Sequence, residues 1–147
     1  MAKPHAHISL ITLGVSDVAR SARFYEELGF VRKMKQAGDA VAFLEAGGIV
    51  LSCFGADDLA KDAGLGPRAP ESGFRGVSLA WNCPSEREVD AVVIMAVEAG
   101  GVCLKPPQKA FWGGYHGHFA DPDGHVWEVA HNPQFPLTPD GRPQLPD

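Results

Sequence analysis

The segment FADPDGHVWE (119–128) reads as a strand, a tight Asp-Pro-Asp-Gly turn and a second strand. The earlier segment FLEAGGIVLS (43–52) follows the same order, with Gly-Gly in the turn. When the two segments are aligned, Ser52 is the internal counterpart of Glu128. The helix caps Asp17 and Ser85 lie 68 residues apart, and the first residues of the two segments, Phe43 and Phe119, lie 76 apart. An internal duplication is the economical explanation.

The chain up to the first of these segments predicts a strand, a helix and further strands. An apolar run at 8–15 indicates a strand, and either Ser16 or Asp17 can cap a helix that begins at Val18. Apolar residues then recur at helical spacing, and Gly29 suits the end of the helix. Three short strands are expected at 31–36, 40–46 and 49–54.

The same pattern restarts after a stretch rich in Gly, Pro and Asp at 55–72, which indicates a connecting loop with a helical turn. A strand is expected at 76–81. The sequence Ser-Glu-Arg-Glu (85–88) is a capping box that opens a helix with a continuous apolar face, and the Gly-Gly pair at 100–101 ends it. Three further strands are expected at 102–105, 115–120 and 125–131.

These patterns predict an α+β fold built from two tandem βαβββ modules. Their curved mixed sheets are expected to surround a cleft, and one helix should pack on each sheet. We expect a single domain over residues 1–147, made of one module at 5–63 and a second at 73–133. A Pro-rich tail at 134–147 has little periodicity and is expected to run over the surface or over a partner subunit.

Composition excludes several kinds of partner. The 147 residues are 45% hydrophobic and 21% charged, and the formal charge is −5, with no block of Lys or Arg that would suit a nucleic acid backbone. No apolar run reaches the roughly 20 residues that cross a bilayer, and the first residues lack a signal-peptide core. We expect a cytoplasmic protein with no membrane contact.

The three cysteines do not suggest a disulfide framework or a metal site. Cys53, Cys83 and Cys103 are odd in number, widely spaced and set among apolar neighbours. We expect them to be reduced, and at least two of them to be buried as small hydrophobic residues.

The sequence resembles a known superfamily. The segment 119–128, together with Val-Ser-Asp (15–17) before a helix that contains Phe-Tyr (24–25) and ends in Leu-Gly-Phe (28–30), is similar to the vicinal oxygen chelate proteins. These include glyoxalase, fosfomycin-resistance, bleomycin-resistance and extradiol-dioxygenase proteins, and the resemblance covers about residues 7–132. It implies a homodimer.

In the metal-dependent members of that superfamily, a divalent cation is held by one His, Gln or Glu from each of four strands. Transferred to this chain, the four positions fall on Leu10, Ser52, Gly76 (or its neighbour Val77) and Glu128. Only Glu128 retains a strong ligand, and one carboxylate with a weak hydroxyl does not hold a catalytic cation. The resemblance therefore predicts no metal and no other cofactor.

An alternative is a divalent metal site in a new place. His116, His118 or His7 could bind a metal together with Glu128, and alternation along a strand places His116 and His118 on one face. Whether His118 lies beside Glu128 depends on the strand register, because a shift of one residue exchanges the faces. The sequence leaves the relocated site open.

A cleft for a small molecule is expected from aromatic residues near these groups. The predicted ligand-binding residues are Glu128, His118, His116, Trp112, Tyr115, Trp81 and Phe54. Trp127 is expected to belong to the core. The Trp-Gly-Gly-Tyr sequence (112–115) could be a lid over a ligand or a simple rigid turn.

The leading functional hypothesis is a glyoxalase/bleomycin-resistance-like protein that binds a small molecule in an aromatic cleft without a metal. The alternative is an enzyme of one of two kinds: a divalent-metal lyase, isomerase or dioxygenase of glyoxalase type with displaced ligands, or a metal-free acid/base catalyst. The candidate catalytic residues are Glu128 and His118. A purely structural module is a third hypothesis.

Overall fold

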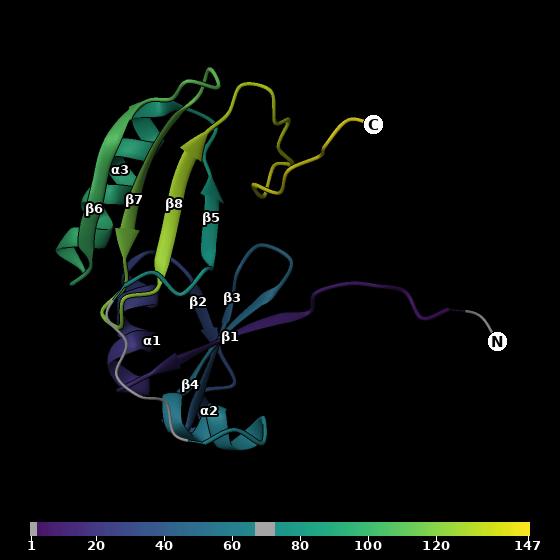
Figure 1. The fold of residues 1–147 in the computed structure, drawn as a ribbon, viewed down its shortest axis with the longest axis vertical. Helices are drawn as coiled ribbons and strands as arrows, with labels where there is room; N and C mark the ends of the chain where they lie inside the picture. Colours follow the sequence, from purple (N-terminus) through teal and green to yellow (C-terminus); the bar gives the residue numbers. More distant parts are fainter. Residues whose placement is uncertain (1–2, 67–72) are drawn as a thin grey trace.

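The computed structural model describes residues 3–66 and 73–147, and confirms the predicted α+β fold of two similar modules (Figure 1). Each module has one four-stranded mixed sheet packed by a helix. The first contains β1 (Leu10–Val15), α1 (Val18–Glu27), β2 (Val31–Lys33), the 3-10 turn η1 (Lys35–Ala37), β3 (Val41–Glu45) and β4 (Val50–Gly55). The second contains β5 (Ser78–Asn82), α3 (Glu86–Glu98), β6 (Val102–Lys109), β7 (Tyr115–Ala120) and β8 (Val126–His131).

The two sheets have the same topology. Their strand orders are β1-β4-β3-β2 and β5-β8-β7-β6, so each sheet begins with a parallel pair and continues with antiparallel pairs. Neither sheet closes on itself. The register of the hairpin β3–β4 places Ser52 opposite Phe43, and that of β7–β8 places Glu128 opposite His118. The second hairpin turn is one residue longer than the first, because Glu45 pairs with Val50 whereas Ala120 pairs with Val126. The equal strand order agrees with an internal duplication.

Several element boundaries differ from those expected. The first strand begins at Leu10, and residues 3–9 extend away from the body as an arm (Figure 1). The strand expected at 31–36 stops at Lys33, because Met34 adopts a left-handed conformation and opens η1. The helical turn expected in the connecting loop is the seven-residue helix α2 (Ala56–Asp62). Part of that loop, 67–72, lies outside the described residues.

The two main helices begin at the expected caps. The Asp17 carboxylate accepts a hydrogen bond from the backbone N–H of Arg20, and the Ser85 hydroxyl accepts one from the N–H of Glu88. Gly29 follows α1 with φ of 101°, a conformation that glycine adopts without strain. In the part of the chain that the structure describes, no helix is long and apolar enough to cross a membrane.

One core joins the two modules. Phe24 on α1 packs against Phe119 of the second sheet, and Tyr25 packs against Trp127, with ring centroids 6.3 and 5.8 Å apart. Trp127 is 5% exposed, so its predicted place in the core is confirmed. Cys53 and Cys83 are buried and Cys103 is exposed, which confirms that at least two cysteines pack as hydrophobic residues.

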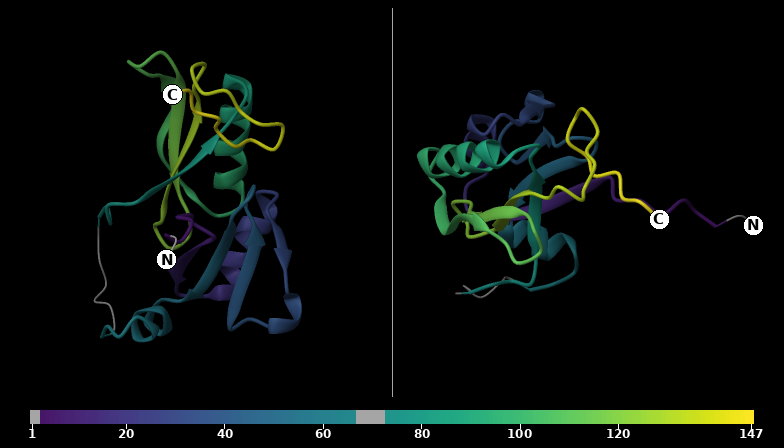
Figure 2. Two further views of the ribbon diagram at one scale, coloured as in Figure 1. Left: turned by 90° about the vertical axis from the view of Figure 1, so that its right-hand side faces the viewer. Right: turned by 90° about the horizontal axis from the view of Figure 1, so that it is seen from above.

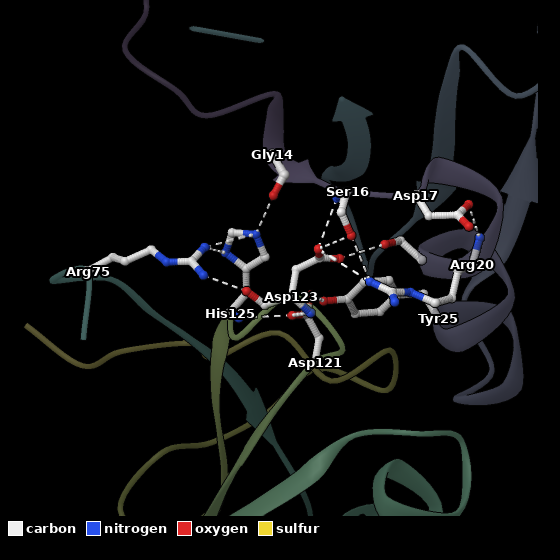
Figure 3. A network of polar contacts seen from close by, with 10 residues as sticks. Gly14, Ser16, Asp17, Arg20, Tyr25, Arg75, Asp121, Asp123 and His125 are labelled. Atoms are coloured by element: carbon white, nitrogen blue, oxygen red, sulfur yellow. Dashed lines mark hydrogen bonds and ion pairs between the residues drawn. The ribbon is translucent and has the colours of Figure 1, made fainter. Parts of the chain in front are cut away.

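A polar network around the Asp-Pro-Asp-Gly turn also ties the modules together (Figure 3). Asp121 is 2% exposed and accepts a 2.6 Å hydrogen bond from the Tyr25 hydroxyl, which itself accepts one from the Trp127 indole at 3.1 Å. The other oxygen of Asp121 accepts hydrogen bonds from two backbone N–H groups of its own turn, those of Asp123 and His125. A turn of common sequence therefore carries contacts to the other module.

Asp123 and His125 reach further into the first module. The Asp123 carboxylate accepts hydrogen bonds from the backbone N–H and the hydroxyl of Ser16, and from the hydroxyl of Ser21. The Nε2 of His125 donates to the carbonyl of Gly14 at 2.8 Å. Although burial opposes its charge, the hydrogen bonds from Ser16 and Ser21 lower the pKa of Asp123 below its ordinary value. Asp17 caps the helix, and Ser16 instead joins the modules.

The tail leaves β8 and reaches the turn between β3 and β4 of the first module. It forms a short hairpin in which Leu137 pairs with Pro143, and Figure 2 shows it leaving the second sheet as a yellow loop. The Arg142 side chain packs against Gly48 in the turn between β3 and β4. The tail therefore contacts the β3–β4 turn of its own chain.

Candidate functional site

A cavity of about 750 Å³ opens between the two modules. Its apolar wall is formed by Ile11, Leu51, Leu79, Phe30, Trp81 and Trp127. The ring of Phe30 lies edge-on to Trp81, with centroids 5.3 Å apart, and 5.8 Å from Trp127. These residues come from β1, β4 and the turn after α1 in the first module, and from β5 and β8 in the second, so the cavity exists only because the modules are packed together.

The rim of the cavity is polar. Glu45 from β3 and Asn82 from β5 lie on it, and the tail contributes Asp140 and Arg142. The Arg142 Nε lies 3.3 Å from a carboxylate oxygen of Asp140, and backbone hydrogen bonds from Thr138 to Arg142 and from Gln144 to Pro136 close the tail hairpin. The site combines an aromatic interior with charges of both signs at its mouth, an arrangement typical of pockets for small organic molecules.

A second candidate site lies on the face of the second sheet that α3 does not cover. His118 on β7 lies directly opposite Glu128 on β8, and His116 lies opposite Ala130. The His116 Nδ1 donates a 2.6 Å hydrogen bond to Glu128 Oε2. The side chains of His116 and Glu128 are 15% and 31% exposed. The register that the sequence left open therefore places all three polar side chains together.

Neighbouring groups shape this polar cluster. The Trp112 ring lies edge-on to His116, with centroids 5.2 Å apart, and the His116 and His118 rings are also 5.2 Å apart. Burial lowers the pKa of His118 below its ordinary value, and the charges of His116 and Lys105 lower it further, whereas Glu128 acts in the opposite direction. Neutral imidazole is therefore favoured at His118.

The structure separates the aromatic residues expected to form one cleft. Trp81 lines the cavity between the modules, and Trp112 lies beside His116. The Tyr115 hydroxyl donates to Asp90 on α3, on the opposite face of the sheet from His116. Phe54 lies on β4 in the first sheet.

The sequence 112–115 forms a turn between β6 and β7. Two backbone hydrogen bonds, from Ala110 to the carbonyl of Gly114 and from Gly113 to the carbonyl of Ala110, close it. The Trp112 ring folds back over Gly114, where a Cβ atom would lie 1.8 Å from that ring. Glycine at 114 is therefore required for Trp112 to reach His116.

Sequence reasoning missed three kinds of residue in the cavity. Phe30 was part of the Leu-Gly-Phe motif, and nothing in the motif indicated that its ring would meet Trp81 across the modules. Leu79 alternates with Ser78 and Ala80 in a short strand, which indicates a buried face without a cavity. Arg142 lies in the tail, where only the Asp-Gly turn signal at 140–141 suggested local structure.

The four positions that hold a cation in metal-dependent vicinal oxygen chelate proteins do not fit a metal here. Leu10 opens β1 with a hydrocarbon side chain, and Gly76 precedes β5 without a side chain. Its neighbour Val77 is apolar, and Ser52 is 2% exposed in β4. Only Glu128 offers a strong ligand atom, so no divalent site is formed at these four positions.

Comparison with known proteins identifies the family. The sequence model of the Glyoxalase/Bleomycin resistance protein/Dioxygenase superfamily matches residues 7–129. The chain belongs to this superfamily, as its sequence resemblance indicated. No curated protein of known function matches it significantly.

Solved structures show the same fold. A glyoxalase-related enzyme from Fulvimarina pelagi is 35% identical, with a TM-score of 0.85 over 96% of this chain and 99% of the other. A glyoxalase/bleomycin resistance protein/dioxygenase family enzyme from Burkholderia phytofirmans PsJN is 20% identical, with a TM-score of 0.76 over 86% and 98%. A lactoylglutathione lyase from Agrobacterium tumefaciens is 21% identical, with a TM-score of 0.65 over 88% and 96%.

Proposed function

We propose that this chain is a small-molecule-binding protein of the glyoxalase/bleomycin resistance superfamily whose ligand lies in the cavity between the modules. The observation that carries the proposal is the cavity of about 750 Å³ with three aromatic rings in its wall. Its volume lies within the range of roughly 300–1,000 Å³ that is usual for small-molecule pockets. Binding there does not involve the four cation positions of the superfamily.

The lining indicates the chemistry of the ligand. Phe30, Trp81 and Trp127 offer ring faces and edges to an aromatic or aliphatic body, and each good aromatic contact contributes on the order of 1 kcal/mol beyond the area that it buries. Arg142 and Glu45 at the rim can receive a polar or charged end. We therefore expect an organic molecule with an apolar body and one polar end.

None of the three residues of the polar cluster lines the cavity, although Ala80 and Asn82 on β5 share their face of the sheet and do line it. This separation favours binding over acid/base catalysis on this ligand. Successive residues of a strand point to opposite faces, so Trp127 faces the core and the cavity while Glu128 faces away. A ligand held against Trp127 does not contact His118 or Glu128. The metal-free acid/base hypothesis would need its substrate on the open face.

A ligand screen with two tryptophan variants tests the proposal. A chemically mixed library is screened by calorimetry against the wild type, and each compound that binds is titrated into Trp81→Ala and Trp112→Ala. Since only Trp81 lines the cavity, we expect affinity to fall at least about tenfold in Trp81→Ala, the loss of one or two aromatic contacts, and to stay unchanged in Trp112→Ala.

Arg142→Ala separates the cavity from the rest of the molecule more gently, because the side chain lies in the tail and outside the core. Compounds with an anionic end should bind more weakly to this variant, and neutral ones equally well. Compounds that lose affinity only in Trp112→Ala would move the ligand to the open face of the second sheet. Compounds that bind all forms equally would refute the assignment to the cavity.

A further inference from the structure

We propose that His116, His118 and Glu128 form a binding site for one divalent transition-metal ion on the open face of the second sheet. One ligand atom from each side chain can be chosen so that all three lie within 4.8 Å of one another. The site is distinct from the four-strand arrangement of the superfamily, because two of its three ligands come from β7. It is also separate from the proposed ligand cavity.

The backbone holds the three side chains in place. His118 and Glu128 are register partners on adjacent antiparallel strands, where Cβ atoms lie about 4.5–5.5 Å apart. His116 is two residues from His118 and therefore points to the same face. Both strands are central in the order β5-β8-β7-β6, so neither is a free edge. A site on paired strands needs no rearrangement of loops.

A simple hydrogen-bonded pair does not account for the whole cluster. His116 and Glu128 bond to each other, but the imidazole of His118 has no hydrogen-bond partner among residues 3–66 and 73–147. Its ring lies 5.2 Å from that of His116 and directly opposite Glu128. The Trp112 ring packs edge-on against His116. Three donor groups thus converge, and one of them has no partner within the described chain.

The donor set selects the class of metal. Two imidazoles and one carboxylate suit Zn²⁺, Co²⁺, Ni²⁺ or Fe²⁺, whereas Mg²⁺ and Ca²⁺ prefer oxygen ligands alone. Around a tetrahedral ion with bonds of about 2.0–2.1 Å, ligand atoms lie about 3.3 Å apart. The contact between His116 and Glu128 must widen from 2.6 Å, and His118 must move closer from within 4.8 Å. Side-chain rotation can make both changes.

Lys105 opposes a cation on this face. It lies opposite His118 on β6, and its exposed ammonium group carries the same charge as the ion. Its long flexible side chain can extend into solvent, so repulsion should weaken binding without preventing it. Lys105→Ala should therefore increase metal affinity, an effect that a merely structural role of the histidines would not produce.

Titration of the full chain with metal tests the proposal. Protein without an affinity tag is stripped with a chelator and titrated with Co²⁺, followed by visible absorption and by calorimetry. We expect one Co²⁺ per chain, displaced by Zn²⁺ and not by Mg²⁺. His118→Gln, His118→Ala and Glu128→Gln should each weaken binding at least about tenfold, since each removes one of three ligands or replaces it by a neutral, weaker one.

The arm of the chain offers a matched control. His5 and His7 stack with centroids 5.6 Å apart on exposed residues, and they are the other closely spaced histidine pair. The double variant His5→Ala/His7→Ala should bind Co²⁺ like the wild type. Circular dichroism of each variant checks that the fold is retained. Binding lost in the arm variant, binding unchanged in Glu128→Gln and both His118 variants, or no stoichiometric binding by the wild type would each overturn the proposal.

Discussion

Replacing Tyr25 by phenylalanine tests how the two modules are held together. The Tyr25 hydroxyl donates a 2.6 Å hydrogen bond to Asp121 and accepts one of 3.1 Å from Trp127, and none of the three side chains is more than 5% exposed. Burial, together with the nearby Asp121 carboxylate, raises the pKa of Tyr25 far above its ordinary value, so the hydroxyl remains a donor. A hydrogen bond to a charged group contributes roughly 1.5–3 kcal/mol, and an unpaired buried indole N–H costs a further 1–3.

We expect Tyr25→Phe to lower the free energy of unfolding by about 3 kcal/mol. For a urea dependence of about 2 kcal/mol per M, the unfolding midpoint should fall by about 1.5 M at fixed protein concentration. Tyr115→Phe is the matched control, because the Tyr115 hydroxyl bonds Asp90 at the surface, and the midpoint should change little. Equal midpoints for Tyr25→Phe and the wild type would show that the buried network does not stabilise the fold.

Three further predictions concern chemistry, pH and assembly. Burial raises the pKa of Cys53 and of Cys83 to about 12, so a thiol reagent should label only Cys103 rapidly in the native protein, as mass spectrometry would show. The pKa of Asp123 is lowered in the folded state from its ordinary value of 3.8. The Asp123 carboxylate therefore stabilises the fold fully above the ordinary pKa, and this stabilisation is lost as the pH falls through the lower folded pKa. The stability deficit of Asp123→Asn in urea should therefore shrink in acid, and a constant deficit would contradict the assignment. Leu10 and Val77 are exposed at or beside the starts of the edge strands β1 and β5, which predicts a homodimer. Light scattering should detect the dimer, and Leu10→Glu should weaken it. A monomeric mass for the wild type at micromolar concentration would exclude it.

Local patterns were sufficient to predict the fold. The capping box at 85–88 and the apolar stripe behind it located α3, and the alternating segment 115–120 located β7 with the same bounds as in the structure. Both signals depend on residues close together in the sequence. Where a boundary was wrong, the cause was a backbone conformation that the side chain does not announce, as at Met34, whose φ of 51° ends β2 early.

The candidate site could be predicted only in part, because it depends on contacts between distant residues. Alternation placed His116 and His118 on one face, but the register that brings Glu128 beside them depends on the hairpin turn. The pocket between the modules depends on how α1 packs on the second sheet. Of the four aromatic residues predicted to bind a ligand, Trp81 alone lines this pocket. Arg142 reaches the rim through the course of the tail, which carries no periodicity.

The most direct test of the proposed function is an experimental structure of the protein with a compound from the ligand screen. The proposal predicts that the compound lies between the modules, with its apolar body against Phe30, Trp81 and Trp127 and its polar end toward Arg142. A compound bound instead on the open face of the second sheet, against His118 and Glu128, would contradict it.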